Sequence, residues 1–209
     1  REVIRLGTRK SRLAMVQAEL AAAAIRKAAP GVEIELVPLV TTGDKILDRS
    51  LVEFGGKGVF IDEFESAIAD GRIDAAVHSA KDMPACLMDG LSIAAVLKRE
   101  DPRDVFVTVK KRETCHSPFV IGTGSLRRQL QIAERKDGVC RLLRGNVNTR
   151  LEKLFSGEYD AVILAAAGLK RLGLLEDERF SFEFLPETEF VPAGGQGIIA
   201  LESRKDSRW

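Results

Sequence analysis

The sequence predicts an α/β protein with two lobes and a cleft between them. Short apolar runs alternate with helical patterns along the whole chain, which is typical of folds with largely parallel sheets. Several runs lack polar–apolar alternation, as in strands that are buried on both faces. Two segments have the composition of crossings between lobes, KREDPRD at 98–104 and VPAGGQG at 191–197. Lobe 1 would then comprise residues 1–97 and 195–209, and lobe 2 residues 98–194.

Eight apolar runs are predicted to be strands. They are Val3–Leu6, Ile34–Val40, Ala75–Val77, Leu91–Val96, Val105–Val109, Phe119–Ile121, Arg141–Leu143 and Ala161–Ala165. Between them, apolar residues at helical spacing predict helices whose apolar stripes face the core. The stripes are Leu13, Val16, Leu20 and Ala24; Ile61, Phe64 and Ile68; Leu126, Leu130 and Ala133; and Leu151, Leu154 and Phe155.

The composition indicates a globular protein without a general affinity for polyanions. Of the 209 residues, 45% are hydrophobic and 30% are charged, and 32 Lys and Arg against 31 Asp and Glu leave a formal net charge of +1. This balance gives no reason to expect nucleic acid as a partner. No apolar run reaches transmembrane length and no signal peptide is visible, so we expect a cytoplasmic protein with no membrane partner.

The cysteines and histidines predict neither a disulfide framework nor a metal site. Cys86, Cys115 and Cys140 are widely spaced and form no C-x-x-C pair, which favours a reducing compartment. His78 follows a buried strand, as a hydrogen-bonded core histidine does, and His116 lies in a polar loop. Two histidines without clustered cysteines or carboxylates make a metal site improbable.

Basic residues at helix starts are the unusual feature of this sequence. In VIGTGSLRRQL, Arg127 and Arg128 follow the helix-capping residue Ser125, where each cation should cost a few tenths of a kcal/mol, up to ~1, against the helix dipole. A bound anion would make them favourable, because arginine forks bind carboxylates and phosphates bidentately. The same strand–turn–basic helix pattern occurs at IRLGTRKSRLA and LLRGNVNTRLEKL. The alternative is a set of solvated arginines paired with Glu134, Glu152 or Asp137.

A run of motifs then gives a family resemblance. The motifs are GTRKSRLA, TTGDKILD, GGKGVFIDEFE, AAVHSAKDMP, KREDPRDVFV, GTGSLRRQ, LRGNVNTRLEKL, ILAAAGLKRLGL and PAGGQG. In this order and spacing the chain resembles the porphobilinogen deaminases, or hydroxymethylbilane synthases, from Val3 to about Arg204. Members of that family are transferases that condense four porphobilinogen molecules head to tail, with release of ammonia, into the linear tetrapyrrole hydroxymethylbilane. Their fold has two periplasmic-binding-protein-like lobes with the active cleft between them, and a third, smaller α+β domain.

The resemblance implies a role for each motif. Asp82 would be the catalytic carboxylate, which stabilises developing positive charge and moves protons; otherwise it is a turn residue before Met83 and Pro84. The cofactor, dipyrromethane, and the substrate, porphobilinogen, carry carboxylates that cationic and hydroxyl groups would bind. The implied binding residues are Arg9, Ser11, Lys57, Phe60, Ser79, Lys81, Thr123, Ser125, Arg127, Arg128, Arg144, Asn146, Arg150, Arg171 and Gln196. Lys57 and Phe60 lie in a glycine-rich segment, GGKGVF, that is either a lid or a plain surface loop. We expect a monomer.

Three departures from the family pattern stand out. Gly124 replaces a serine, Glu53 stands where many members have a basic residue, and the sequence stops before the family's third domain. That domain carries the cysteine that bonds dipyrromethane, and none of the three cysteines here has its context. We therefore expect these 209 residues alone to be inactive. The alternative function is a non-enzymatic polycarboxylate- or oxyanion-binding protein of the periplasmic-binding-protein type.

Overall fold

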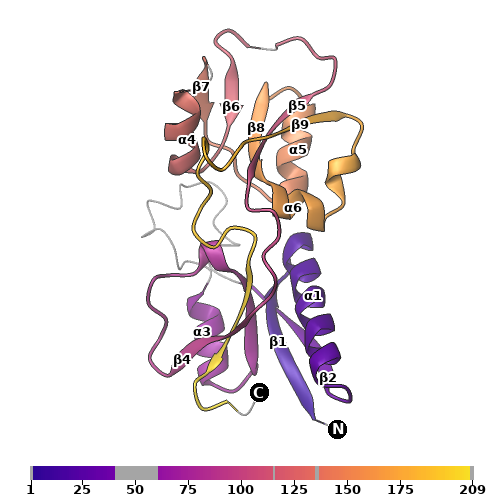
Figure 1. The fold of residues 1–209 in the computed structure, drawn as a ribbon, viewed down its shortest axis with the longest axis vertical. Helices are drawn as coiled ribbons and strands as arrows, with labels where there is room; N and C mark the ends of the chain where they lie inside the picture. Colours follow the sequence, from indigo (N-terminus) through magenta and orange to yellow (C-terminus); the bar gives the residue numbers. More distant parts are fainter. Residues whose placement is uncertain (1, 41–60, 115, 135–136, 208–209) are drawn as a thin grey trace. The chain divides into compact units, whose positions relative to one another are not determined.

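The fold is described from a computed structural model of the chain, in which residues 2–40, 61–114, 116–134 and 137–207 are described (Figure 1). The chain divides into two compact units. Unit 1 contains residues 1–100 and 197–209, and unit 2 contains residues 101–196. The chain therefore passes from one unit to the other twice.

Unit 1 holds, within its described residues, a five-stranded sheet of order β2-β1-β3-β10-β4. Its elements are β1 (Val3–Arg9), α1 (Arg12–Ala28), β2 (Glu33–Leu39), α3 (Asp62–Ala69), β3 (Ala75–Ser79), the 3-10 helix η2 (Ala80–Asp82), β4 (Leu91–Val96) and β10 (Ile199–Arg204). Strand β1 is parallel to β2 and β3, whereas β10 is antiparallel to β3 and β4. The antiparallel strand is the segment that returns from unit 2.

Unit 2 holds a second five-stranded sheet, of order β7-β6-β8-β5-β9, among its described residues. Its elements are β5 (Asp104–Val109), β6 (Val120–Gly122), α4 (Leu126–Ala133), β7 (Val139–Arg141), α5 (Val147–Phe155), β8 (Ala161–Ala165), α6 (Ala166–Arg171), the 3-10 helix η3 (Leu174–Glu176) and β9 (Phe180–Phe184). Strand β6 is parallel to β7 and β8, and β5 is antiparallel to β8 and β9. Both units are thus mixed α/β sheets.

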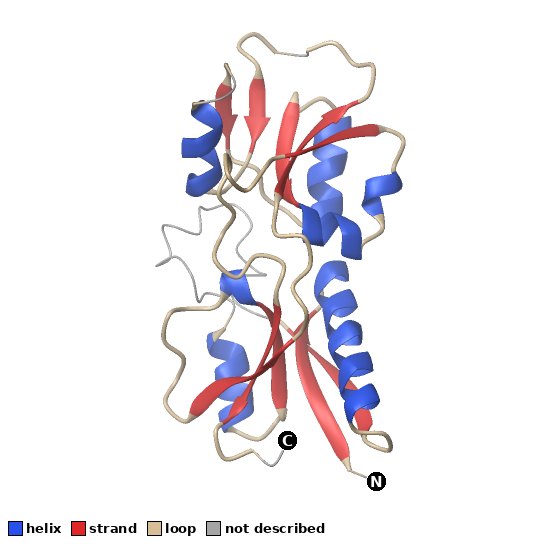
Figure 2. Ribbon diagram, viewed as in Figure 1, coloured by secondary structure: helices blue, strands red, loops and turns tan. Residues whose placement is uncertain are grey.

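Each sheet packs a core on both of its faces (Figure 2). In unit 1, Ala75 and Val77 of β3 pack with α1, while the intervening Ala76 packs with Phe64 and Ile68 of α3. This explains why the strands read as continuous apolar runs. Among the described residues, no helix is both long and apolar enough to cross a bilayer.

The strands predicted from sequence are present, with ends that differ by up to three residues, but β9 and β10 were not predicted. Strand β9, FSFEF, exposes Ser181 and Glu183, and β10, IALESR, ends in polar residues that are mostly buried. Strand β10 directly follows the crossing segment VPAGGQG, whose Gly and Pro content obscured the strand pattern, whereas β9 is a short run of alternating apolar and polar residues.

Two predicted helix stripes face the wrong way. Helix α1 buries Gln17, Ala18, Ala21 and Ala22 instead of the predicted stripe, and Leu20 is 43% exposed. Small alanines let the helix axis approach the sheet closely, which the larger side chains would prevent.

In α4, Leu126 and Leu130 are 59% and 64% exposed, whereas Arg128 and Ile132 are buried. The other two stripes were right except at one position: Ile61, Phe64, Ile68, Leu151 and Leu154 are buried. Phe155 is 39% exposed.

The corrected face of α1 makes a stability prediction. Ala21→Leu should lower the free energy of unfolding by about 1–3 kcal/mol, because the side chain is fully buried against the sheet. Ala24→Leu, on the exposed side, should change it by less than about 0.5 kcal/mol. Urea unfolding of both variants measures the difference. A larger loss of stability for Ala24→Leu than for Ala21→Leu would show that the stripe predicted from sequence is the buried one.

Candidate functional site

One edge of the unit 1 sheet gathers five of the predicted site residues. Strands β1 and β3 are parallel, so their carboxyl ends, at Arg9 and Ser79, lie at the same edge. Ser11 begins α1 there, and its side chain accepts a hydrogen bond from the Ala14 N–H at 3.3 Å. Lys81 and Asp82 follow β3 in η2.

The turn that carries Asp82 is anchored from beneath. Buried Gln17 donates from Nε2 to Ser79 Oγ at 3.0 Å, and the Ala80 N–H donates to the Ile198 carbonyl at 3.0 Å. Asp82 itself is exposed. A carboxylate on a short fixed turn can accept N–H donors from a ligand, balance positive charge and exchange protons.

A buried acid–histidine cluster lies under the same turn. His78 Nε2 is 2.9 Å from Glu202 Oε2, and both side chains are buried, as the sequence predicted for His78. Glu65 of α3 is also buried and accepts the Met88 N–H at 2.8 Å. Burial raises the pKa of Glu65 above its usual value, and the neighbouring Glu202 raises it further.

In unit 2, the parallel strands β6, β7 and β8 bring most of the remaining site residues to one edge. Thr123 and Ser125 follow β6, and Ser125 caps α4 by accepting the Arg128 N–H at 3.4 Å. Asn146 follows β7 and caps α5 by accepting the Thr149 N–H at 2.9 Å. Arg144 precedes this cap. Each helix start thus presents backbone N–H groups and polar side chains together.

The two arginines of α4 share an acidic partner that the sequence did not reveal. Asp104, at the start of β5, is fully buried and lies 2.7 Å from Arg127 Nη1 and 2.6 Å from Arg128 Nη2. Burial alone would raise the pKa of Asp104, but Arg128 and Arg127 outweigh it and hold this pKa below its usual value. The buried carboxylate of Asp104 therefore offsets the positive charge at the start of α4.

Arg128 is buried, with 6% of its surface exposed. Its Nε and Nη2 donate to Asp104 Oδ1 at 3.0 and 2.6 Å, and its Nη1 donates to the Ile163 carbonyl at 3.0 Å. Gln196 joins this network through Nε2, which donates to Asp104 Oδ1 at 3.0 Å and to the Pro102 carbonyl at 2.6 Å. These contacts give Arg128 and Gln196 structural roles, and their ligand-binding roles stay predictions.

Arg127 is more accessible than its neighbour. Its Nη1 donates to the Val191 carbonyl at 2.6 Å, and its side chain is 26% exposed. Gln131 holds Val191 in place, because its Oε1 accepts the Val191 N–H at 2.6 Å and its Nε2 donates to the Val191 carbonyl at 3.0 Å. Sequence reasoning missed Gln131 and Asp104. The sequence contained one indication of such an acidic partner: two arginines at a helix start are unfavourable unless an anion lies nearby.

The other predicted arginines are half-buried. Arg150 donates from Nε to the Gly145 carbonyl at 2.8 Å, which ties it to the turn before α5. Arg171 ends α6. Lys57 and Phe60 lie outside the described residues, as does Glu53.

Gly124 lies against the segment that follows β7. A Cβ at this position would be 3.1 Å from the Leu143 carbonyl oxygen. A serine here would therefore press on that backbone, so the glycine suits a closely packed turn.

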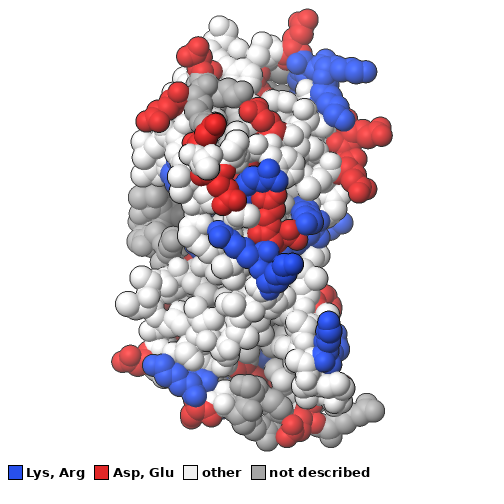
Figure 3. Space-filling model, in the orientation of Figure 1, with Lys and Arg blue, Asp and Glu red and all other residues white. Residues whose placement is uncertain are grey.

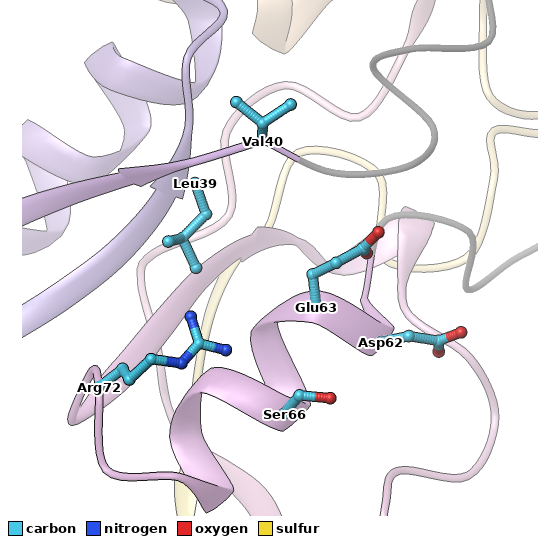
Figure 4. Close-up of a pocket in the computed structure, with 6 residues that line it drawn as sticks. All are labelled: Leu39, Val40, Asp62, Glu63, Ser66 and Arg72. Atoms are coloured by element: carbon cyan, nitrogen blue, oxygen red, sulfur yellow. The ribbon is translucent and has the colours of Figure 1, made fainter.

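One described hollow in unit 1 does not lie at these positions. A pocket of about 390 Å³ is lined by Leu39, Val40, Asp62, Glu63, Ser66 and Arg72 (Figure 4). Acidic residues at the start of α3 contribute to its wall. None of the predicted ligand-binding residues lines it. On the face drawn in Figure 3, Lys and Arg lie among Asp and Glu, without one dominant basic field. Within the described ranges, no His, Cys, Asp and Glu side chains form a group able to hold a metal ion.

Comparison with known families gives one match over nearly the whole chain. The model of the family described as "Porphobilinogen deaminase, dipyromethane cofactor binding domain" matches residues 4–209.

Solved structures share the fold at low sequence identity. The BenM effector binding domain with benzoate has a TM-score of 0.55 and 15% identity, covering 98% of this chain and 84% of that one. The periplasmic VFT2 domain of Bordetella pertussis BvgS has a TM-score of 0.55 and 14% identity, with 97% and 81% covered. An arginine-specific periplasmic binding protein of Salmonella typhimurium has a TM-score of 0.51 and 13% identity, with 99% and 87% covered. The two-lobed, periplasmic-binding-protein-like fold expected from sequence is thus confirmed.

The buried ion pair makes a stability prediction. Arg128→Met should lower the free energy of unfolding by about 3–5 kcal/mol, because it removes a buried partner of Asp104. Arg127→Met removes a more exposed partner and should cost less. Guanidinium chloride unfolding, followed by a probe in unit 2, compares the two. Equal losses would contradict the different burial of the two arginines.

The raised pKa of Glu65 makes a pH prediction. The folded state holds a proton that the unfolded chain releases, so stability from this group is present below the usual pKa of 4.5 and lost as pH rises through the folded pKa. Glu65→Gln imitates the protonated form and can still accept the Met88 N–H.

The variant should therefore gain stability relative to the natural chain as pH increases above 4.5. Glu33→Gln, at an exposed position in β2, serves as the control. Thermal unfolding at several pH values measures both. Parallel pH curves for the natural chain and Glu65→Gln would show that Glu65 gains no proton on folding.

Proposed function

Because this chain belongs to the porphobilinogen deaminase family, we propose that it takes part in condensing porphobilinogen, with release of ammonia, into the linear tetrapyrrole hydroxymethylbilane. The observation that carries the proposal is a division of chemistry between the units. Unit 1 presents an exposed carboxylate, Asp82, on an anchored turn. Unit 2 presents cations and helix starts suited to carboxylates.

The donor set of unit 2 fits the dipyrromethane cofactor. Acetate and propionate side chains on a pyrrole need several separate cationic or N–H donors. Unit 2 offers the arginines Arg127, Arg144 and Arg150 near the starts of α4 and α5, and arginine forks match carboxylates in shape and charge. When bound, the cofactor supplies the pyrrole end that is extended. We propose that Thr123, Ser125 and Asn146 add polar contacts, and that Arg9, Ser11, Ser79 and Lys81 bind ligand carboxylates in unit 1.

Asp82 would act on the reacting pyrroles. Loss of ammonia from porphobilinogen leaves a positively charged methylene-pyrrole, which the carbon of the next pyrrole attacks. A carboxylate beside the pyrrole N–H groups stabilises that charge, and it can accept and return the protons that the condensation releases. The exposed position of Asp82 makes its carboxylate reachable from solvent, while Gln17 and Ser79 hold the strand that precedes it.

A second candidate function is capture of a small polycarboxylate without catalysis. The structural neighbours include an effector binding domain with benzoate and an arginine-specific periplasmic binding protein. This function would explain the arginines, but it does not explain the exposed carboxylate of Asp82. For either function we propose a monomer in the cytoplasm, where free Cys86 and Cys140 would stay reduced.

The test of Asp82 uses the complete natural protein loaded with cofactor. Asp82→Asn should lower the rate of porphobilinogen consumption at least about 100-fold, because the amide cannot balance the positive charge or take up a proton. An Ehrlich-type colour assay measures the remaining pyrrole. Asp89→Asn, at an exposed position in the same unit, should keep the natural rate.

The two functions give different results in this assay. Consumption of porphobilinogen by the natural protein supports the transferase. Binding of a synthetic dipyrromethane without any consumption favours the binding protein. Full activity of Asp82→Asn with normal cofactor content would exclude the catalytic role of Asp82.

A further inference from the structure

We propose that Asp104 is a positioning residue that holds Arg127 with one edge of its guanidinium open to a ligand carboxylate, while it fixes Arg128 in the core. The inference rests on the proposed function, because that function supplies the carboxylate ligand. It assigns a role to a residue that the family resemblance did not single out. Its evidence is the way in which the two oxygens of Asp104 are divided.

Each oxygen of Asp104 serves a different arginine. Oδ1 accepts Nε and Nη2 of Arg128 and also Nε2 of Gln196, so this oxygen belongs to the buried network. Oδ2 lies 2.7 Å from Nη1 of Arg127. The carboxylate is fully buried, so water does not compete for either oxygen. One rigid group thus sets the positions of both guanidinium groups.

The contacts of Arg127 fall on one nitrogen. Nη1 donates to the Val191 carbonyl and forms an ion pair with Asp104 Oδ2, an oxygen that has no hydrogen-bond partner in the described part of the chain. Within the part of the chain that the structure describes, no hydrogen bond engages Nε or Nη2 of Arg127. These two nitrogens form the side edge of the fork, which binds a carboxylate through two parallel N–H bonds. Arg128 uses the same edge on Asp104 itself.

The segment behind Arg127 reinforces this orientation. Gln131, one turn further along α4, holds both the N–H and the carbonyl of Val191. The guanidinium carbon of Arg127 also lies 6.0 Å from the centre of the ring of Phe190, which is fully buried. The guanidinium is therefore restrained before any ligand arrives, which lowers the entropy lost on binding.

The charge balance also favours an anion at this place. Two arginines face Asp104 at the start of α4, where the helix dipole adds to their positive charge. Because Arg128 is buried and Arg127 is partly exposed, positive charge is accessible at Arg127. A ligand carboxylate would offset it.

The experiment compares Asp104→Asn with Asp101→Asn in the same chain. Asp101 lies three residues earlier and pairs with Arg103 at 2.6 Å, so it is a half-buried carboxylate of the same segment with its own arginine partner. NMR signals of the arginine Nε–H groups, assigned with Arg127→Lys and Arg128→Lys, report on each guanidinium. The binding probe is a synthetic dipyrromethane with acetate and propionate side chains, and its tetramethyl ester is the uncharged control.

Asp104→Asn should lower the NMR order parameter of the Arg127 Nε–H vector and weaken binding of the dipyrromethane acid at least tenfold, or about 1.4 kcal/mol. Binding of the ester should not change, and Asp101→Asn should behave like the natural chain. An unchanged order parameter and affinity in a folded Asp104→Asn variant would overturn the inference. If the natural chain does not bind the acid, the proposed function fails, while the order parameters still test whether Asp104 orders Arg127.

A second variant covers the case in which Asp104→Asn does not fold. Gln131→Ala removes both hydrogen bonds to Val191 without removing a buried charge. It should therefore increase the motion of the Arg127 guanidinium measured by NMR and weaken acid binding, while the Arg128 guanidinium stays ordered. Gln129→Ala, at a half-buried position on the same helix, is its control. Equal behaviour of both variants, with Arg127 still ordered, would contradict the positioning network.

Discussion

The architecture of unit 2 depends on one buried carboxylate, Asp104. Without it, two adjacent guanidinium groups at the positive end of α4 would repel each other and the helix dipole. With it, Arg128 can be buried among apolar strands, because each of its nitrogens has an acceptor. The start of β5, strand β8 and the start of α4 are thereby tied together, close to the residues proposed to bind ligand at the start of α4.

The edges of the two units that carry the candidate site residues are stabilised by different means. Unit 2 uses charge, with an ion-pair network around Asp104. Unit 1 uses hydrogen bonds between buried polar groups, namely Gln17 with Ser79 and His78 with Glu202. The difference follows from what each edge presents. An exposed carboxylate such as Asp82 needs a rigid turn beneath it, whereas a cluster of cations needs a counter-charge.

Helix faces were harder to predict than strands, for a physical reason. Strands such as Val105–Val109 were clear from the sequence because both faces are largely buried, so every residue in the run except Thr108 is apolar. In α1 the buried residues are mostly alanines, which pack the helix closely against its sheet. In α4 the leucines of the predicted stripe are exposed, and Arg128 lies with Ile132 on the inner face. A stripe of leucines identifies a helix, but the partner surface decides which side is buried.

The sequence by itself determined the strand–helix order, the capped helix starts at Ser11, Ser125 and Asn146, and the motifs that place the chain in its family. These are local features, set by residues within one or two turns of each other. Only the tertiary structure decided that Arg128 is structural while Arg127 stays accessible. Their shared partner, Asp104, is separated from them by more than twenty residues, and long-range pairing of charges leaves no periodic trace in a sequence.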